Sequence, residues 1–230
     1  MRVALVSGAA RGLGAAIAER LAAEGWTLSL GARDPEAARG RFPQCHAARF
    51  DADAPETAPD WVAEAAERFG RIDALVNNAG ALRMVDFARG SEDDLDALWS
   101  VNVKAPFRLI RAALPHLKAS GSGRVVNIAS TDGKRYRDAT TSLGYVMTKH
   151  ALVAMTHAVR FAGWEEGVRA TAICPGAIDT EMIADLPGVT PKAQRLTPET
   201  VAGIVAFVLS LPNAASVPEL VANTRLESTL

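Results

Sequence analysis

Residues 3–14 read VALVSGAARGLG, and this stretch predicts the first strand, the turn after it and the start of the first helix. It begins with a short apolar run, Val3–Ser7, of the kind that forms a buried strand. Glycines in a Gly-x-x-x-Gly-x-Gly spacing follow, and they allow a tight turn and a close backbone approach to a ligand. A helix is predicted over Leu13–Glu24. A strand, a glycine-rich turn and a helix in this order predict a βα unit whose helix N-terminus can bind phosphate.

Similar apolar runs alternate with helix-like segments along the rest of the chain. The predicted strands are Thr27–Leu30, Cys45–Phe50, Ile72–Val76, Arg124–Ile128 and Val168–Ile173, with Leu220–Ala222 as a candidate last strand. Such alternation favours parallel strands joined by helices on both faces of a sheet. We therefore expect an α/β fold: a single doubly wound Rossmann-type domain over residues 1–230, with a mostly parallel sheet flanked by helices.

Composition narrows the class of protein. The chain has 230 residues, is 49% hydrophobic and 22% charged, and carries a net charge of −1 with no basic stripe, which disfavours nucleic-acid binding. Its longest apolar stretch, Ala202–Leu211, is shorter than the roughly 20 residues of a membrane helix, and the first apolar run is too brief for a signal peptide. Cys45 and Cys174 lie far apart, and the histidines lack ligand spacing. We predict a cytoplasmic protein with no metal, no nucleic-acid partner and no membrane partner.

Four motifs occur at set points along the chain. They are Ser7–Gly14, which follows a strand, Asp51–Ala52, Asn77–Gly80, and Pro175–Thr180 with the pattern Pro-Gly-x-x-x-Thr. Their sequence and order resemble the short-chain dehydrogenase/reductase family, with Ser7 in place of the usual threonine. The resemblance covers roughly residues 3 to 210. It implies an NAD(P)-dependent short-chain dehydrogenase/reductase enzyme, in which the second motif contacts adenine and the last contacts the nicotinamide.

The resemblance also implies where the cofactor binds. The implied contacts are Gly8, Arg11, Gly12, Leu13, Gly14, Arg33, Asp51, Ala52, Asn78, Ala79, Gly80, Tyr145, Lys149, Pro175, Gly176 and Thr180. We expect the Asn-Asn-Ala-Gly motif to be mostly structural.

The end of the second predicted strand bears on the choice of cofactor. NAD-using relatives carry an acidic residue where this chain has Ala32, and Arg33 follows. An arginine there, helped by Arg11, can pair with a 2′-phosphate. Alternatively, Arg33 is a solvated arginine that pairs with Asp34, or Asp34 takes the acidic role. NADP(H) is favoured, and NAD(H) stays open.

Tyr145 and Lys149 lie four residues apart at the start of a predicted apolar helix and therefore share a face. The Lys149 ammonium and a positive nicotinamide ring favour the Tyr145 phenolate, so Tyr145 is expected to act as general acid in reduction and general base in oxidation. Ser130 is the candidate to hold the substrate carbonyl oxygen, because Gly133 follows it as the family glycine does, and Ser142 lies too close to the tyrosine to replace it. Asn102 matches the family asparagine that supports the lysine. The ordinary alternatives are that Tyr145 and Lys149 form an amphipathic pair, that Ser130 is a turn residue, and that Asn102 is a buried asparagine.

These residues predict hydride transfer between NADP(H) and a small-molecule carbonyl or alcohol substrate. Alternatives are an NAD-dependent alcohol or sugar dehydrogenase of the same fold, or a non-catalytic cofactor-binding regulator. We expect a substrate-covering loop near residues 181–196. A negative group on the substrate would suit the cations after Ser130 and the arginine after the Asn-Asn-Ala-Gly motif, although such loop charges are usually solvated. These four cations are Arg83, Lys134, Arg135 and Arg137.

Leu143–Phe161 is apolar around most of its circumference. A helix of this kind needs burial on two sides, and the sheet supplies only one. We therefore expect a homodimer or homotetramer in which a second subunit covers this helix.

Overall fold

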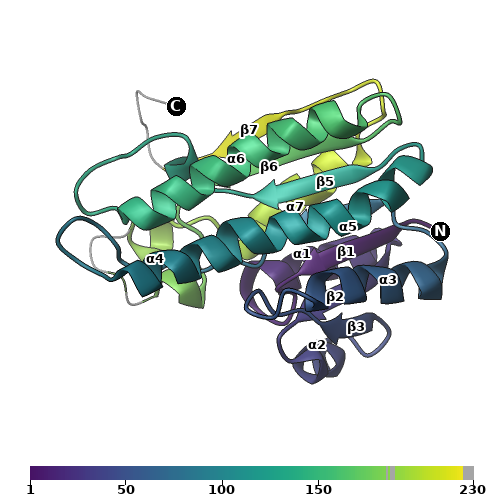
Figure 1. Cartoon of the computed structure of the whole chain (residues 1–230), viewed down its shortest axis with the longest axis horizontal. Coiled ribbons are helices and arrows are strands. Elements are labelled where there is room, and N and C mark those ends of the chain that lie inside the picture. The colour runs from purple at the N-terminus through teal and green to yellow at the C-terminus, as the bar shows by residue number, and fades with distance from the viewer. Residues whose placement is uncertain (185, 187–189, 225–230) are drawn as a thin grey trace.

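The computed structural model describes residues 1–184, 186 and 190–224. Its strands form one parallel sheet in the order β3-β2-β1-β4-β5-β6-β7 (Figure 1). Their bounds are β1 Val3–Ser7, β2 Thr27–Ala32, β3 His46–Arg49, β4 Ala74–Asn77, β5 Arg124–Ile128, β6 Arg169–Pro175 and β7 Glu219–Ala222. The predicted parallel α/β fold is confirmed, and the candidate last strand is present as β7.

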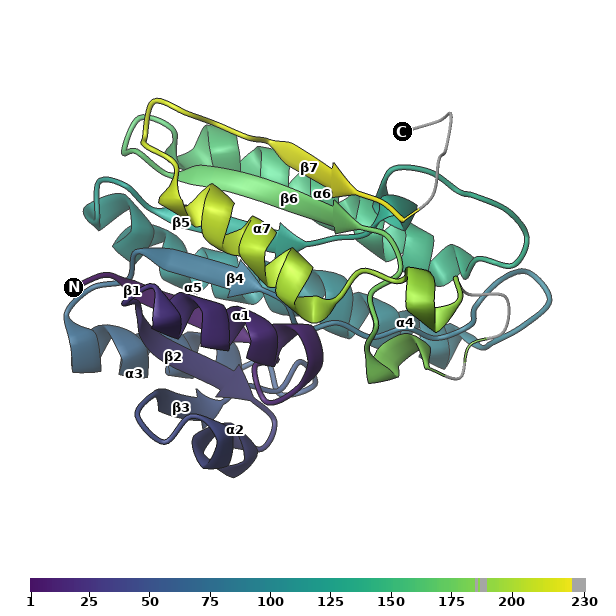
Figure 2. The same cartoon turned by 180° about the vertical axis from the view of Figure 1, so that it is seen from behind.

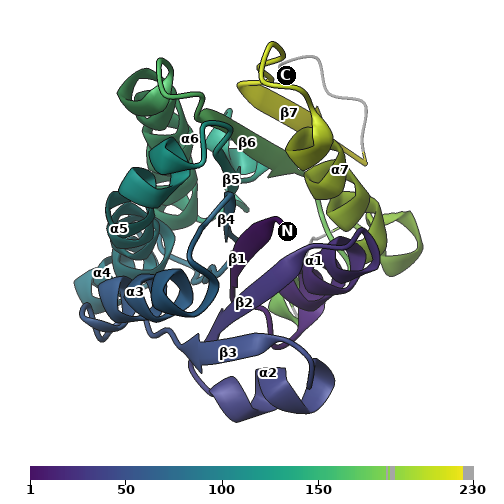
Figure 3. The same ribbon diagram turned by 90° about the vertical axis from the view of Figure 1, so that its right-hand side faces the viewer.

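The helices cover the sheet in two layers. Their bounds are α1 Gly12–Ala23, α2 Pro35–Arg41, α3 Thr57–Phe69, α4 Glu92–Trp99, α5 Ala105–Ala119, α6 Leu143–Gly163 and α7 Pro198–Ser210. Figure 1 shows α3, α5 and α6 on one face, and Figure 2 shows α1 and α7 on the other. The end view in Figure 3 separates the two layers, with the sheet between them. Each layer has its own apolar core against the sheet.

The central strands consist mostly of apolar residues, which the helices bury on both faces of the sheet. Every residue of β1, β4 and β5 is buried, as expected for central strands of a parallel sheet covered by helices. β4 starts at Ala74, two residues later than the apolar run beginning at Ile72 predicts. The Asp73 carboxylate accounts for the difference, because it accepts the Val3 N–H (2.8 Å) at the start of the sheet.

The strand order reverses next to β1. The chain builds β1, β2 and β3 outward in one direction, then returns to place β4 on the other side of β1. Ligands of open parallel sheets bind at such a switch point, outside the carboxyl ends of the strands. The reversal places the glycine loop after β1 beside the segment that follows β4.

Among the residues that the structure describes, no helix combines the length and the apolar character that a bilayer-spanning helix needs.

Candidate functional site

A cavity of about 1020 Å³ opens at the carboxyl ends of the strands. Every residue that the sequence predicts to contact the cofactor lines it, from the glycine loop to Thr180. Its walls also include apolar side chains that the motifs do not mark, namely Leu82, Val101, Ile178, Met182 and Ile183. Leu82 follows β4, and the last three lie in the loop after β6, so their place beyond the strand ends is the signal that could have found them. Val101 lies in the turn between α4 and α5, where no such signal marks it.

The glycine loop has room only for backbone. Gly8 and Gly12 have φ angles of +68° and +55°, which side chains rarely adopt. A Cβ on Gly14 would lie 2.2 Å from the Gly8 carbonyl oxygen. Asn78 holds the loop in place, because its Nδ2 donates to the Ser7 carbonyl (3.0 Å) and its backbone N–H donates to Ser7 Oγ (3.0 Å). The Asn-Asn-Ala-Gly motif thus braces the loop and lines the cavity.

The N-terminus of α1 is open toward the cavity. Arg11 stands at its N-cap without a side-chain capping bond, and its first turn contains no acidic residue. By contrast, α2 and α6 are capped by the side chains of Asp34 and Ser142. The first N–H groups of α1 and its positive dipole end therefore suit a phosphate group. These features fit a dinucleotide.

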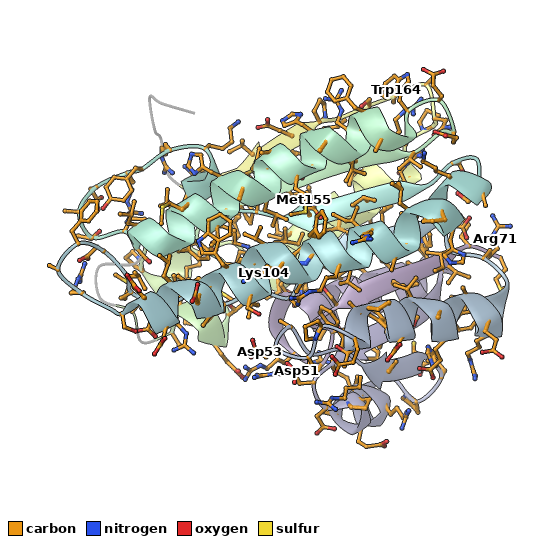
Figure 4. The ribbon with its side chains drawn as sticks, in the orientation of Figure 1. Asp51, Asp53, Arg71, Lys104, Met155 and Trp164 are labelled. Atoms are coloured by element: carbon orange, nitrogen blue, oxygen red, sulfur yellow. The ribbon has the colours of Figure 1, made fainter. Side chains whose placement is uncertain are left out.

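The end of β2 presents a cation to the same cavity. Arg33 is exposed, lines the cavity, and forms no hydrogen bond or ion pair with the residues in the described part of the chain. Asp34 instead accepts the backbone N–H groups of Glu36 (3.0 Å) and Ala37 (3.4 Å). The alternative in which Arg33 pairs with Asp34 is therefore not observed. Asp51 and Asp53, labelled in Figure 4, lie near the carboxyl end of the next strand, β3.

Tyr145 and Lys149 lie together at the start of α6. Ser142 caps this helix by accepting the Tyr145 N–H (3.2 Å). The buried Lys149 Nζ lies 5.5 Å from the centre of the Tyr145 ring and donates to the Ile128 carbonyl (2.8 Å). One helical turn therefore places phenol and amine side by side, as their spacing predicts.

Burial shifts the pKa values of both Tyr145 and Lys149. It raises the pKa of Tyr145 well above its usual value, the Asp132 carboxylate adds to the rise, and a hydrogen bond with Ser130 opposes it. Burial lowers the pKa of Lys149 to about 8. The protein's own groups thus favour the phenol, opposite to the shift that we expect from the Lys149 ammonium. The neutral phenol is therefore the favoured form of Tyr145.

Ser130 lies beside Tyr145 but does not line the cavity as the described residues outline it. Its Oγ accepts the Asp132 N–H (3.1 Å) and caps the short 3-10 helix Thr131–Gly133. With that lone pair engaged, its own O–H remains available to donate toward the tyrosine or a bound oxygen.

Asn102 is buried in a π-helical turn, Ser100–Lys104, and does not line the cavity either. Its Oδ1 accepts the Ala81 N–H (2.9 Å), and its Nδ2 donates to the Ala81 carbonyl (2.9 Å) and to Thr148 Oγ1 (3.1 Å). It therefore ties the segment after β4 to α6, next to Lys149.

Ser142, which its spacing from Tyr145 excludes as a substrate-binding group, has a different role. Besides capping α6, its Oγ donates to the Arg83 carbonyl (2.6 Å) and accepts the Val85 N–H (3.2 Å). A serine just before a helix is a typical cap, but the sequence does not reveal its second partner.

The cations after Ser130 are paired outside the cavity. Lys134 bonds to Glu219, Arg135 lies 3.5 Å from Asp132, and Arg137 lies 2.9 Å from Asp138; none lines the cavity. The cavity lining therefore gives no support to the expectation that these three face the substrate. Arg83, the fourth cation, does line it.

The described residues contain no cluster of three or more histidine, cysteine or acidic side chains suited to a metal ion. Cys174 is buried, as expected for a packing residue.

The chain resembles many known proteins. The family model of the short chain dehydrogenases matches residues 2–188. Agropine synthesis reductase of Rhizobium rhizogenes is 44% identical over 94% of this chain, but the chain spans about half (51%) of that relative's length. Oxidoreductase UcpA of Escherichia coli is 35% identical, over 79% of this chain and 71% of its own. Among solved structures, an alcohol dehydrogenase from the archaeon Thermococcus sibiricus, complexed with 5-hydroxy-NADP, has a TM-score of 0.87 and 31% identity, covering 96% of this chain and 95% of its own.

Proposed function

This chain belongs to the short-chain dehydrogenase family, and we propose that it transfers a hydride between NADP(H) and a carbonyl or alcohol substrate. The observation that carries the proposal is the convergence of residues far apart in the sequence on one cavity. The glycine loop, Arg33, Tyr145 and Lys149 all line it. A non-catalytic regulator would have no use for the paired phenol and amine.

NADP(H) is proposed over NAD(H) because of charge at the end of β2. Arg33 has no partner in the described part of the chain, and Asp34 is engaged in capping α2. A 2′-phosphate would give Arg33 a charge-assisted partner, whereas a ribose hydroxyl would leave it solvated. The archaeal alcohol dehydrogenase complexed with an NADP derivative is consistent with this choice. An NAD-dependent alcohol or sugar dehydrogenase is the second candidate.

In the proposed mechanism, the bound nicotinamide supplies or accepts the hydride. Tyr145 donates its phenolic proton to the substrate oxygen during reduction and takes it back during oxidation. Ser130 donates a hydrogen bond to the same oxygen. Lys149, held by the Ile128 carbonyl, supplies positive charge beside the phenol as its proton leaves. Asn102 positions the segment after β4 rather than touching the reacting atoms.

The loop after β6 would cover the substrate. Thr180 and the 3-10 turn Glu181–Ile183 line the cavity, and a second short turn occurs at Lys192–Gln194. The rest of the predicted loop, at residues 185 and 187–189, lies outside the described residues.

A screen of aldehydes, ketones and alcohols with NADPH or NADH (NADP⁺ or NAD⁺ for the alcohols) tests the proposal. We expect turnover with at least one carbonyl class and a higher kcat/KM for NADPH than for NADH. Binding of both cofactors without any turnover would favour the regulator, and preference for NADH would favour the second candidate.

We also propose a homodimer or homotetramer and a reducing, cytoplasmic location. Phe161, on α6, is 86% exposed, and Trp164 just beyond its end is 41% exposed and lies at the far end of the helix in Figure 4. A second subunit would cover such apolar side chains. Both cysteines are free, which suits a reducing compartment. Light scattering at micromolar concentration tests the assembly, and a monomer mass would refute it.

A further inference from the structure

We infer that Arg83 selects substrates that carry a carboxylate or phosphate group near the reacting carbonyl. The inference rests on the proposed function and names the substrate class of that same site. It depends on where Arg83 is held, on which of its nitrogen atoms have partners, and on the pairing of the neighbouring cations.

The chain places Arg83 within reach of the reacting groups. Gly80 lies beside the lysine, because a Cβ built on Gly80 would be 3.7 Å from Lys149 Nζ. Arg83 follows three residues later, a separation of at most about 10 Å along an extended chain. Both Arg83 and Tyr145 line the cavity. An anion bound by Arg83 is therefore close enough to belong to a small substrate whose carbonyl lies at Tyr145.

The backbone around Arg83 is anchored on both sides to the helix that carries Tyr145 and Lys149. Before it, Ala81 is fixed through both its N–H and its carbonyl by Asn102, which also bonds to Thr148 of α6. The Arg83 carbonyl itself accepts a hydrogen bond from Ser142, the cap of α6 (2.6 Å). The position of the Arg83 backbone is thus set by the catalytic helix, as a specificity residue requires.

The guanidinium has donors left for a ligand. Its Nη1 lies 3.2 Å from Asp94 Oδ1, while Nε and Nη2 have no bonded partner among the described residues. Nε and Nη2 form the side of the guanidinium that presents two parallel N–H groups to a carboxylate or phosphate. The Arg83 and Asp94 side chains are 52% and 35% exposed, and a surface pair of this kind holds its partners weakly. An anionic substrate can therefore bind the free edge without first breaking a strong ion pair.

The other cations near this end of the cavity are engaged. Arg11 belongs to the glycine loop at the cofactor end and forms an exposed ion pair with Glu181 (2.7 Å), and Lys149 donates to the Ile128 carbonyl. The cations after Ser130 are paired with carboxylates outside the cavity. Arg83 is the cavity-lining cation beyond β4 whose side chain has free donors and a weak partner. Leu82 and Met182 also line the cavity and suit the apolar body of such a substrate.

The experiment compares two aldehydes of nearly the same shape with NADPH, 4-carboxybenzaldehyde, which is charged, and 4-formylbenzamide, which is not. Wild type is expected to have a kcat/KM about ten- to a hundredfold higher for the carboxylate. Arg83→Met, which keeps the apolar stem, should abolish that preference by raising KM for the carboxylate far more than for the amide, and Arg83→Lys should retain part of it. Arg89→Met is the matched control, because Arg89 lies in the same loop, pairs with Asp86 and does not line the cavity.

Binding of 4-carboxybenzaldehyde to the protein loaded with NADP⁺, followed by fluorescence, gives a readout independent of turnover. If both aldehydes are turned over and Arg83→Met changes their kcat/KM equally or not at all, the anion site is overturned and the proposed oxidoreductase activity stands. Binding that depends on Arg83 without turnover of either aldehyde would support the anion site and count against the proposed function. If the protein neither binds 4-carboxybenzaldehyde nor turns over either aldehyde, both the anion site and the proposed function are overturned.

Discussion

The two ends of the parallel sheet are both rich in charge, but they use it differently. At the amino end, Asp73 is buried and accepts hydrogen bonds from Val3 N (2.8 Å) and the Arg71 guanidinium. Buried Arg124 donates to the Leu211 carbonyl and to Asn213 Oδ1 (2.8 Å each). Figure 4 shows Arg71 and Trp164 at this end. The Asp73 carboxylate and the Arg124 guanidinium are thus paired within the protein.

The carboxyl end leaves polar groups open. The first turn of α1 is uncapped, Arg33 lacks a partner among the described residues, and Arg83 has two free nitrogen atoms. Burial works against the charge of Lys149, whose pKa falls to about 8. We therefore propose that charge at the amino end stabilises the fold, whereas Arg33 and Arg83 at the carboxyl end serve a ligand. Substitutions at the two ends should separate stability from activity.

The largest expected effect is on the rate. Tyr145→Phe removes the proposed proton donor and should lower kcat by about 10²–10⁴, with cofactor affinity nearly unchanged. Steady-state kinetics and a cofactor titration measure the two quantities. Turnover within about threefold of wild type would remove Tyr145 from the mechanism.

The next effect is on stability alone. Asp73→Ala leaves the Val3 N–H and the Arg71 guanidinium without their acceptor and should lower the free energy of unfolding by about 3 kcal/mol. Urea denaturation measures it, with exposed Glu67→Ala as a control expected within about 0.5 kcal/mol of wild type. The folded variant should keep its kcat, and a large loss of kcat would break the division between the two ends.

A smaller effect concerns cofactor choice. Arg33→Ala should weaken NADPH binding roughly tenfold and leave NADH binding unchanged, because only the 2′-phosphate pairs with the guanidinium. Arg41→Ala is the matched control, since Arg41 bonds to Glu19 and does not line the cavity. Equal losses for the two cofactors would show that Arg33 does not discriminate between them.

The smallest effect is a gain in stability at the carboxyl end. Lys149→Met should stop turnover yet raise the free energy of unfolding by about 1 kcal/mol at pH 7, because a buried ammonium is costly. In wild type the Lys149 pKa falls from 10.5 to about 8 on folding, so between these values the unfolded chain binds more protons. Wild-type stability should then rise with pH across this window.

The advantage of Lys149→Met should accordingly shrink from pH 8 to pH 10.5. Denaturation at a series of pH values measures it, with the exposed Lys104→Met as the control. If the difference in unfolding free energy between Lys149→Met and wild type is constant with pH, burial does not lower the Lys149 pKa.

The sequence by itself determined the sheet, the glycine loop and the pairing of Tyr145 with Lys149. Strand and helix periodicity are local properties, and parallel strands bring their carboxyl ends to one edge wherever the chain runs between them. Residues at or just after the ends of different strands, such as Pro175 and Asn78, therefore line one cavity, as the family resemblance implied.

Only the tertiary structure decided which side chains find partners. Lys134 bonds to Glu219, which lies far along the chain, although Asp132 and Asp138 are nearer in sequence. Ser142 joins two segments through a single hydroxyl. Such contacts depend on atoms meeting within hydrogen-bond distance across many residues of chain, and no local pattern encodes that distance. The same long-range packing buries Tyr145 and raises its pKa, so the neutral phenol is favoured. Burial disfavours a charged group whatever its neighbours in sequence.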